Sequence, residues 1–429
     1  MDFSLKYAQE RDSADPLKEF RSAFHIPPHG NNGSCIYFTG NSLGLQPKKA
    51  KEYILEELED WAALGVEGHT QARRPWMPYH ENFTQTLAQL TGAKSSEVVA
   101  MGTLTANLHF LLVSFYRPST HKRKIVCEAK AFPSDQYALK SQIAFHGGNP
   151  ETDLIELHPR PGEHCLRTED IIETLQARQD EIALVMLSGV NYYTGQLFDM
   201  AKITSAAKKL GLVVGWDIAH AMGNVPLQLH DWGVDFAAWC SYKYLNGGPG
   251  CVSGIFVHER YHKQNDLPRF AGWWGHDKEN RFAMPDTFVP IASAEAWQHS
   301  NPPILGMTAL LASLELFEKA GIENLRIKGL ELHAYLRFVI NEISQRTGVP
   351  MQIITPENEQ AHGCQVSLVL PSNGKALFDA ITEKGVIADW REPDVIRMAP
   401  VPLYNSFEDI YTFGHILEKA IEKTVNRHV

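Results

Sequence analysis

Two short apolar runs separated by an amphipathic segment constrain the fold of this 429-residue chain most strongly. The runs EIALVMLSG and LVVGWD have the length and composition of buried strands. Between them, DMAKITSAAKKLG predicts a helix that Asp199 caps and Gly211 ends. Its apolar residues Met200, Ile203 and Ala207 share one helical face. A strand, a helix and a strand in this order form a right-handed crossover, so the sequence predicts a parallel sheet.

Other apolar runs extend this sheet. The segments EVVAMG, KIVCE, DFAAWC and GCVSGIFV predict further strands, and a helix is expected to begin near residues 104–106, after a Thr-rich turn. From about residue 305 the sequence predicts long helices, followed by a carboxy-terminal segment of mixed secondary structure. Because the chain exceeds the size at which a single core keeps growing, we expect two domains. The predicted fold is α/β: a large domain over 60–304 with a mainly parallel sheet flanked by helices, and a smaller α+β domain formed by 1–59 with 305–429.

Composition narrows the classes of partner. The net charge is −10 and the only short basic run, HKRK at 121–124, suits a loop before a strand, so neither nucleic acid nor a membrane is expected as a partner. The six cysteines form no Cys-x-x-Cys pair, which fits neither a disulfide framework nor a zinc site and favours a reducing cytoplasm. The amino terminus lacks the apolar core of a signal peptide, and the segment around LHFLLVSFY is too short to span a membrane.

Polar residues follow several of the predicted strands. TLTAN, at 103–107, begins a helix whose free N–H groups and dipole favour a phosphate, although ordinary helix caps look the same. In AFPSD, Phe132 suits a core position and Asp135 a helix cap equally well. In WDIAHAMGN, Asp217 closes a buried strand and His220 follows it. A buried carboxylate needs a partner, which is either an internal salt bridge or cap, or a protonated heterocycle.

The stretch CSYKYLNGGPG places Lys243 at the end of another strand, on the same sheet edge as Asp217. A lysine that burial desolvates becomes a nucleophile, commonly as a Schiff base with an aldehyde. Pyridoxal 5′-phosphate requires such a lysine, an acid for its pyridine nitrogen, an aromatic plate and a helix end for its phosphate. Taken together, Lys243, Asp217, Phe132 and the TLTAN turn match these needs, and we predict this cofactor.

The motifs extend over nearly the whole chain. YFTGNSLGLQPK, RPW, AFPSD, SGVNYYTGQ, HDWGVDFAAWCSYKYLN, GWWGH, SNPPIL and IRMAPVPLYNS occur in this order. The sequence thereby resembles the kynureninase family, within the fold-type I pyridoxal-phosphate enzymes of the class V aminotransferase group. The resemblance implies a homodimeric enzyme that cleaves the Cβ–Cγ bond of the amino acid L-kynurenine or its 3-hydroxy form with water. The products would be L-alanine and anthranilate or 3-hydroxyanthranilate, in tryptophan catabolism or NAD biosynthesis.

The resemblance also implies a role for individual residues. Lys243, Tyr242 and Asp217 would be catalytic: the lysine forms the Schiff base, the tyrosine helps to protonate the β-carbon, and the aspartate pairs with the pyridinium. Arg397 would bind the α-carboxylate in a two-pronged contact, although a surface cation is the alternative. The cofactor-binding residues would be Leu104, Thr105, Phe132, Pro133, Ser134, Asp135, Ser188, Asp217, His220, Tyr242, Lys243, Trp273 and Asn301. The resemblance implies that Asn301 would face the site across a dimer interface.

Substrate choice is assigned to a smaller set. His69, Ser300 and Asn301 resemble the pattern of family members that prefer 3-hydroxykynurenine, so we hypothesise this preference.

Two alternative functions share parts of the sequence pattern. A cysteine desulfurase or selenocysteine lyase has the same fold and lysine but requires a reactive cysteine on a loop, and the cysteines here lie mostly in apolar runs. The second alternative function is that of a protein that binds the cofactor without catalysing a reaction.

Overall fold

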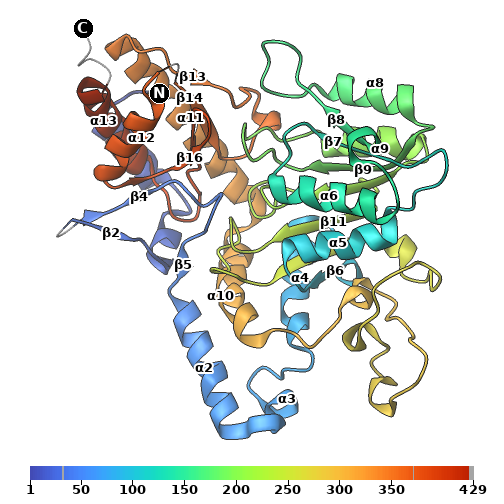
Figure 1. The fold of residues 1–429 in the computed structure, drawn as a ribbon. Coiled ribbons are helices and arrows are strands. Elements are labelled where there is room, and N and C mark those ends of the chain that lie inside the picture. Colours follow the sequence, from blue (N-terminus) through green and yellow to red (C-terminus); the bar gives the residue numbers. More distant parts are fainter. Residues whose placement is uncertain (31–32, 371, 425–429) are drawn as a thin grey trace.

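A seven-stranded sheet forms the centre of the molecule (Figure 1). The structure is a computed structural model that describes residues 1–30, 33–370 and 372–424. In spatial order the strands are β6 (Val98–Ala100), β12 (Ser253–Val257), β11 (Phe236–Cys240), β10 (Val213–Asp217), β9 (Ile182–Ser188), β7 (Lys124–Glu128) and β8 (Leu154–Leu157). The pairs from β11 to β8 are parallel, whereas β12 runs antiparallel to both of its neighbours. The prediction of a mainly parallel sheet is confirmed.

The sheet is apolar on both faces because its strands are covered on both sides. In β9, Leu184 and Met186 pack into one core cluster, whereas Val185 and Leu187 pack into another. Side chains alternate between the faces of a strand, so an uninterrupted apolar run such as ALVML supplies both clusters at once. This is why the run is continuous and does not alternate with polar residues.

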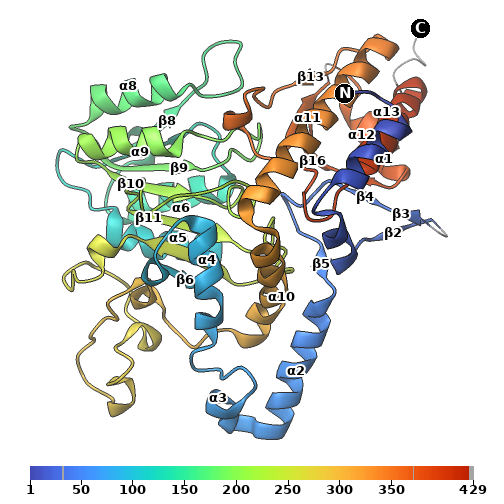
Figure 2. The same ribbon diagram turned by 180° about the vertical axis from the view of Figure 1, so that it is seen from behind.

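Helices cover the two faces in separate groups. Figure 1 shows α5 (Leu104–Phe115) and α6 (Pro133–Phe145) in front of the sheet, and Figure 2 shows α4 (Thr84–Thr91), α8 (Thr168–Arg178) and α9 (Met200–Lys209) on the other face. The short helix α7 (Pro150–Asp153) precedes β8. Asp199 caps α9 through the backbone N–H of Lys202, at 2.9 Å, which confirms the helix expected between the first two apolar runs.

A second core lies around a four-stranded antiparallel sheet. Its strands are, in order, β13 (Gln352–Ile353), β14 (Val366–Val369), β17 (Val395–Met398) and β16 (Asp389–Arg391). The helices packed around this core are α1 (Leu5–Ala14), α11 (Ile322–Thr347), α12 (Gly374–Glu383) and α13 (Phe407–Thr424). Because α1 and α13 pack together, the first and the last helix of the described chain meet at this second core, as Figures 1 and 2 show.

Short paired strands and one long helix connect these parts. The short pairs are β1 (Phe24–His25) with β5 (Gln46–Pro47), β2 (Pro28–His29) with β3 (Gly33–Ser34), and β4 (Ile36–Tyr37) with β15 (Val386–Ile387). The helix α2 (Lys49–Leu64) then packs along α10 (Ile304–Ala320) and leads to α3 (Gly68–Gln71). Met307, Leu310 and Phe317 of α10 pack into the larger core. We propose that the chain divides into a large domain over 60–304 and a smaller domain formed by 1–59 with 305–429. In this division α10 is the helix that joins the two domains.

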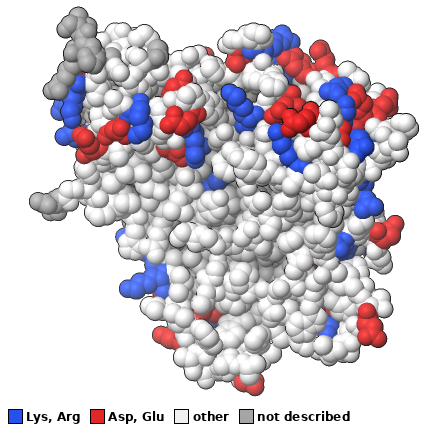
Figure 3. All heavy atoms as spheres, viewed as in Figure 1, with Lys and Arg blue, Asp and Glu red and all other residues white. Residues whose placement is uncertain are grey.

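The surface carries charges of both signs. Figure 3 shows basic and acidic side chains interspersed on one face of the molecule. Among the described residues, none of the helices is both long enough and apolar enough to cross a membrane.

Candidate active site

The carboxyl ends of the central parallel strands bring the predicted site residues together. β10 ends at Asp217 and β9 at Ser188, and these two residues are direct partners in the sheet. β7 ends at Glu128, and Lys243 follows the end of β11 by three residues. Ligands of open α/β sheets bind at this edge, so the geometry agrees with the position expected from the sequence.

A cavity of about 190 Å³ opens at this edge. Ten of the predicted residues line it: Leu104, Thr105, Phe132, Ser134, Asp135, Ser188, Asp217, His220, Tyr242 and Lys243. The remaining lining residues are Thr103, Val190, Tyr192, Gly250, Cys251 and Ser253. The four loops singled out by sequence reasoning thus contribute to one cavity.

Two helix amino termini point to one end of the cavity. α5 begins at Leu104 and α6 at Pro133, and the hydroxyl groups of Thr105 and Ser134 lie 2.6 Å apart between them. The cap residues of both helices form no side-chain hydrogen bond to the helix, so the first-turn N–H groups are not used by these caps. Free N–H groups and the positive ends of two helix dipoles favour a phosphate here.

Three carboxyl groups, those of Asp135, Asp217 and Glu128, lie close enough to interact at this site. Burial raises the pKa of Asp135 well above its ordinary value, and the nearby carboxylates of Asp217 and Glu128 raise it further, while Lys243 opposes them. Burial also raises the pKa of Glu128, although hydrogen bonds from the hydroxyl and N–H of Ser188 oppose this. A cluster of acids around one lysine attracts a positively charged group such as a protonated pyridine.

The catalytic candidates face the same space. The ammonium nitrogen of Lys243 lies 5.8 Å from the centre of the Phe132 ring. His220 is buried, and its pKa is well below the ordinary value because of burial and of the cations Lys243, Arg397 and Arg391. Its Nδ1 has no hydrogen-bond partner within the described parts of the chain. Burial raises the pKa of Tyr242, so this phenol keeps its proton at neutral pH.

These features fit pyridoxal 5′-phosphate. The exposed fraction of Phe132 is 39% although the ring lines a cavity, so one aromatic face is left for a planar ligand. The unpartnered His220 Nδ1 needs a polar group from a ligand, and the two helix ends need an anion. Lys243 and Asp217 line the same cavity. One cavity therefore contains the lysine, the carboxylic acid, the aromatic ring and the anion site that this cofactor requires.

Six predicted residues do not line this cavity in a single chain: Pro133, Trp273, Ser300, Asn301, Arg397 and His69. Pro133 is the first residue of α6 and holds the helix start beside the cavity. Trp273, Ser300 and Asn301 are exposed on the surface. Arg397, in β17, is buried, and its guanidinium carbon lies 5.9 Å from the ring centre of Tyr192, which does line the cavity.

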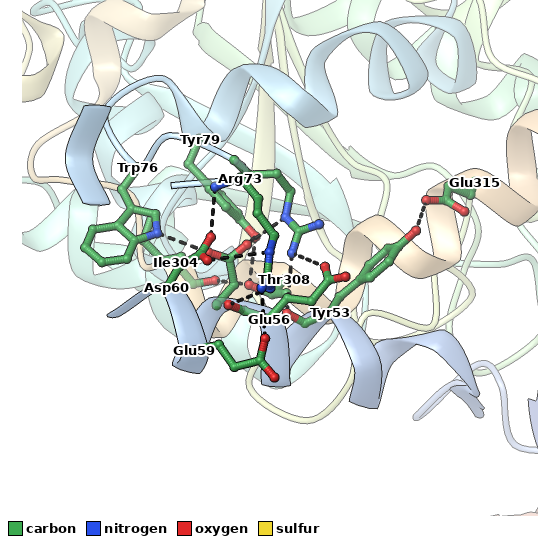
Figure 4. A network of polar contacts seen from close by, with 12 residues as sticks. Tyr53, Glu56, Glu59, Asp60, Arg73, Trp76, Tyr79, Ile304, Thr308 and Glu315 are labelled. Carbon is green, nitrogen blue, oxygen red and sulfur yellow. Dashed lines mark hydrogen bonds and ion pairs between the residues drawn. The ribbon is translucent and has the colours of Figure 1, made fainter. Parts of the chain in front are cut away.

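His69 lies in α3, at the far end of α2. Its ring packs edge-on against Trp76, with ring centres 5.5 Å apart. Figure 4 shows the polar network that holds this extension together: the indole of Trp76 donates to Glu57 at 3.0 Å, and Arg73 pairs with Glu59 at 2.9 Å. The same network reaches α10, because the hydroxyl groups of Tyr79 and Thr308 lie 2.8 Å apart.

Sequence reasoning missed two residues at the site. Glu128 ends a buried strand with a carboxylate, which is the same signal that identified Asp217, and it accepts hydrogen bonds from Ser188. Tyr192 lies in the SGVNYYTGQ motif, which carried the resemblance without a role for this residue. Its ring meets Phe132 edge-on at 5.3 Å and closes one side of the cavity.

The chain is similar to known kynureninases over nearly its whole length. The family model described as the kynureninase C-terminal domain matches residues 325–417. A kynureninase of Flavobacterium psychrophilum is 55% identical over 419 residues, covering 97% of this chain and 98% of that protein. The chain belongs to the kynureninase family. A member from the sea anemone Nematostella vectensis is 47% identical, with 98% of this chain and 94% of that protein covered.

Solved structures share the fold of this kynureninase family member. The apo structure of a cysteine desulfurase from Thermococcus onnurineus matches with a TM-score of 0.72 and 18% identity, over 91% of this chain and 95% of that chain. A C-DES mutant with glycine covalently linked to its pyridoxal-phosphate cofactor matches with a TM-score of 0.74 and 17% identity, over 90% and 96%. These likenesses show the fold alone, which is that of fold-type I pyridoxal-phosphate enzymes.

Proposed function

We propose that this protein is a pyridoxal-phosphate-dependent kynureninase, a hydrolase that acts on carbon–carbon bonds in ketonic substances. It cleaves the Cβ–Cγ bond of L-kynurenine, its 3-hydroxy form, or both, and releases L-alanine with anthranilate or 3-hydroxyanthranilate. Family membership supports this function. The observation that carries it is the convergence of Lys243, Asp217 and two helix amino termini on one cavity.

The chain's own residues divide the work. When bound, the cofactor supplies a protonated ring that accepts electrons from the α-carbon of the substrate. Asp217 would pair with the ring nitrogen, and the amino terminus of α5, at Leu104 and Thr105, would hold the phosphate. Lys243 would hold the cofactor through its aldehyde and would carry the proton at the α-carbon of the substrate.

Tyr242 is proposed as the acid that protonates the β-carbon. A general acid must hold a proton at working pH, and burial keeps the pKa of this phenol raised. The residue stands directly before Lys243 and lines the same cavity. Proton donor and proton shuttle are therefore presented to the substrate from one short loop.

The substrate preference is proposed to be for 3-hydroxykynurenine. His69, Ser300 and Asn301 offer polar groups that a ring hydroxyl can bond. Comparable values of kcat/KM for both substrates, or a higher value for kynurenine, would contradict this preference.

A homodimer is proposed to complete the site. Trp273 and Asn301 are exposed in a single chain, and large exposed side chains, Phe270, Phe282 and Met284, lie nearby in sequence. A second copy that covers these apolar side chains would bring Trp273 and Asn301 toward a partner's cavity.

The localisation is proposed to be cytoplasmic, and the pathway tryptophan breakdown or NAD synthesis. The free cysteines among the described residues support this localisation.

Subunit mixing tests the shared site. Lys243→Ala and Trp273→Ala are each expected to be inactive as homodimers. Random mixing of the two variants under conditions of subunit exchange is expected to restore about a quarter of the activity, because half the dimers are mixed and each has one intact site. No recovery in the mixture, with dimers confirmed by light scattering, would mean that Trp273 serves its own chain or none.

Turnover of kynurenine beside 3-hydroxykynurenine tests the function itself. The loaded protein is expected to absorb visible light through the Schiff base with Lys243 and to form L-alanine. Lys243→Ala is expected to lose both the absorbance band and the product. Protein that stays colourless after cofactor addition, or a coloured protein that forms no alanine from either substrate, would overturn the proposal. Sulfide release from L-cysteine would instead support a desulfurase.

A further inference from the structure

One face of the hairpin formed by β16 and β17 carries three charged residues. Asp389 of β16 lies directly opposite Arg397 of β17 in the antiparallel register. Arg391 follows Asp389 by two positions on the same strand, so the two side chains share a face. The pattern D-x-R on one strand and R on the next therefore gathers two guanidinium groups around one carboxylate.

The contacts show how that carboxylate is shared. Oδ2 of Asp389 accepts a hydrogen bond from Nη2 of Arg397, and Nη2 of Arg391 reaches the same oxygen at 3.2 Å. Nη1 of Arg397 donates to the backbone carbonyl of Tyr192 at 2.6 Å. The two guanidinium groups and the one carboxylate together carry an excess of one positive charge.

Each of the two arginines has one further hydrogen-bond donor, its Nε–H group. The Nε–H groups of Arg391 and Arg397 are buried and have no hydrogen-bond partner within residues 1–30, 33–370 and 372–424. A buried donor without a partner costs free energy that a ligand oxygen can recover. The two residues differ in access, because Arg397 is 1% exposed whereas the side chain of Arg391 is 36% exposed.

The excess charge lies beside the cavity. Tyr192, which lines the cavity, stands over Arg397, and both guanidinium groups lower the pKa of the cavity residue His220 after burial and Lys243. Burial also lowers the pKa of Arg397, Asp389 opposes this, and the like charge of Arg391 lowers it again. An anion that enters between the two arginines would relieve this repulsion.

We infer that Arg391 is a second guanidinium of the substrate-carboxylate subsite, which binds the α-carboxylate of the amino acid together with Arg397. The inference rests on the proposed function for the identity of the amino acid, and on the shared Asp389 for the charge. Arg397 alone would be neutralised by Asp389, so it is Arg391 that gives the subsite its net positive charge. The more exposed Arg391 receives the incoming carboxylate, and the buried Arg397 fixes its orientation.

The test compares the binding of L-alanine with that of ethylamine, which lacks the carboxylate. Binding to the cofactor-loaded enzyme is measured by inhibition or by the change in cofactor absorbance. Arg391→Gln is expected to weaken L-alanine binding about tenfold or more and to raise KM for kynurenine by a similar factor, since a charged hydrogen bond and the excess charge are both lost. Ethylamine binding is expected to stay unchanged. Arg391→Lys is expected to recover part of the loss.

A matched control and two outcomes keep the inference separate from the function. Arg160→Gln removes an exposed arginine that pairs with Asp170 near α8, and all constants should equal those of the unmodified enzyme. Unchanged L-alanine binding in Arg391→Gln, or an equal loss for L-alanine and ethylamine, would overturn the inference. An unmodified enzyme that discriminates L-alanine from ethylamine but turns over no kynurenine would instead overturn the proposed function and leave the subsite standing.

Discussion

A pair of stacked histidines predicts how the stability of this enzyme depends on pH. His333 of α11 and His362 have ring centres 3.6 Å apart and planes inclined by 13°. Both rings are buried, and the charged groups that act on them are the guanidinium groups of Arg326 and Arg337. Burial lowers the pKa of His362 from 6.5 to about 4, and the two arginines act in the same direction. The pair is therefore neutral at pH 7 in the folded protein.

The sign of the effect follows from proton uptake. Unfolded His362 takes up a proton near pH 6.5, whereas the folded residue resists it until about pH 4. Between these values the unfolded state binds more protons, so stability is full above about pH 6.5 and falls as the pH drops. From pH 7 to pH 5, His362 alone is expected to remove about 2 kcal/mol from the free energy of unfolding. His333, whose pKa is also well below its ordinary value through burial and the charge of His362, adds to the loss.

Urea unfolding at pH 7, 6 and 5, with saturating cofactor throughout, measures this dependence. His362→Gln keeps a donor for the carbonyl of Gly363, to which His362 Nδ1 lies at 2.6 Å, but it does not titrate. The variant is therefore expected to lose clearly less stability than the unmodified enzyme over the same pH range. His415→Gln, at a partly exposed ring on α13, serves as the control and should follow the unmodified curve.

The reasoning fails if His362→Gln and the unmodified enzyme lose equal free energy between pH 7 and pH 5. It also fails if the unmodified enzyme gains stability on acidification to pH 5 while the variant does not. A lower stability of the variant at pH 7 does not bear on the argument, because only the change with pH is compared.

Three further variants test other parts of the structure. Asp235→Ala should cost about 3–5 kcal/mol in urea unfolding, because Lys208, 2.7 Å from the carboxylate, would be left without its partner beside β11. Tyr242→Phe should lower kcat about 100-fold or more while the Schiff-base absorbance stays, whereas an unchanged kcat would remove this residue as the acid. Cys251→Ser should leave kynurenine turnover intact, since burial raises the pKa of this thiol to about 12 and keeps it protonated.

Sequence patterns were sufficient for the sheet and for the cofactor end of the site. A short continuous apolar run predicts a strand covered on both faces, and a polar residue at its end is expected at the sheet edge, so Asp217 and Lys243 could be placed together. Ser188 was expected only from the family resemblance, and it lies beside Asp217 in the sheet. The same rule applied to KIVCE would have found Glu128. Tyr192 could not be found in this way, because its turn owes its position to side chains far away in the sequence.

That turn explains why the substrate end of the site escapes local sequence reasoning. Three successive carbonyls, from residues 192 to 194, accept hydrogen bonds from the smaller domain: Tyr192 from Gln365 and Arg397, Tyr193 from Ser367 and Thr194 from Thr355. Each donor lies in or next to β13, β14 or β17, more than 150 residues further along the chain. This part of the cavity wall is therefore held by hydrogen bonds from residues in and beside the four-stranded sheet. Because Arg397 both docks the turn and faces the proposed carboxylate subsite, binding of the carboxylate and the docking of the domains depend on one side chain.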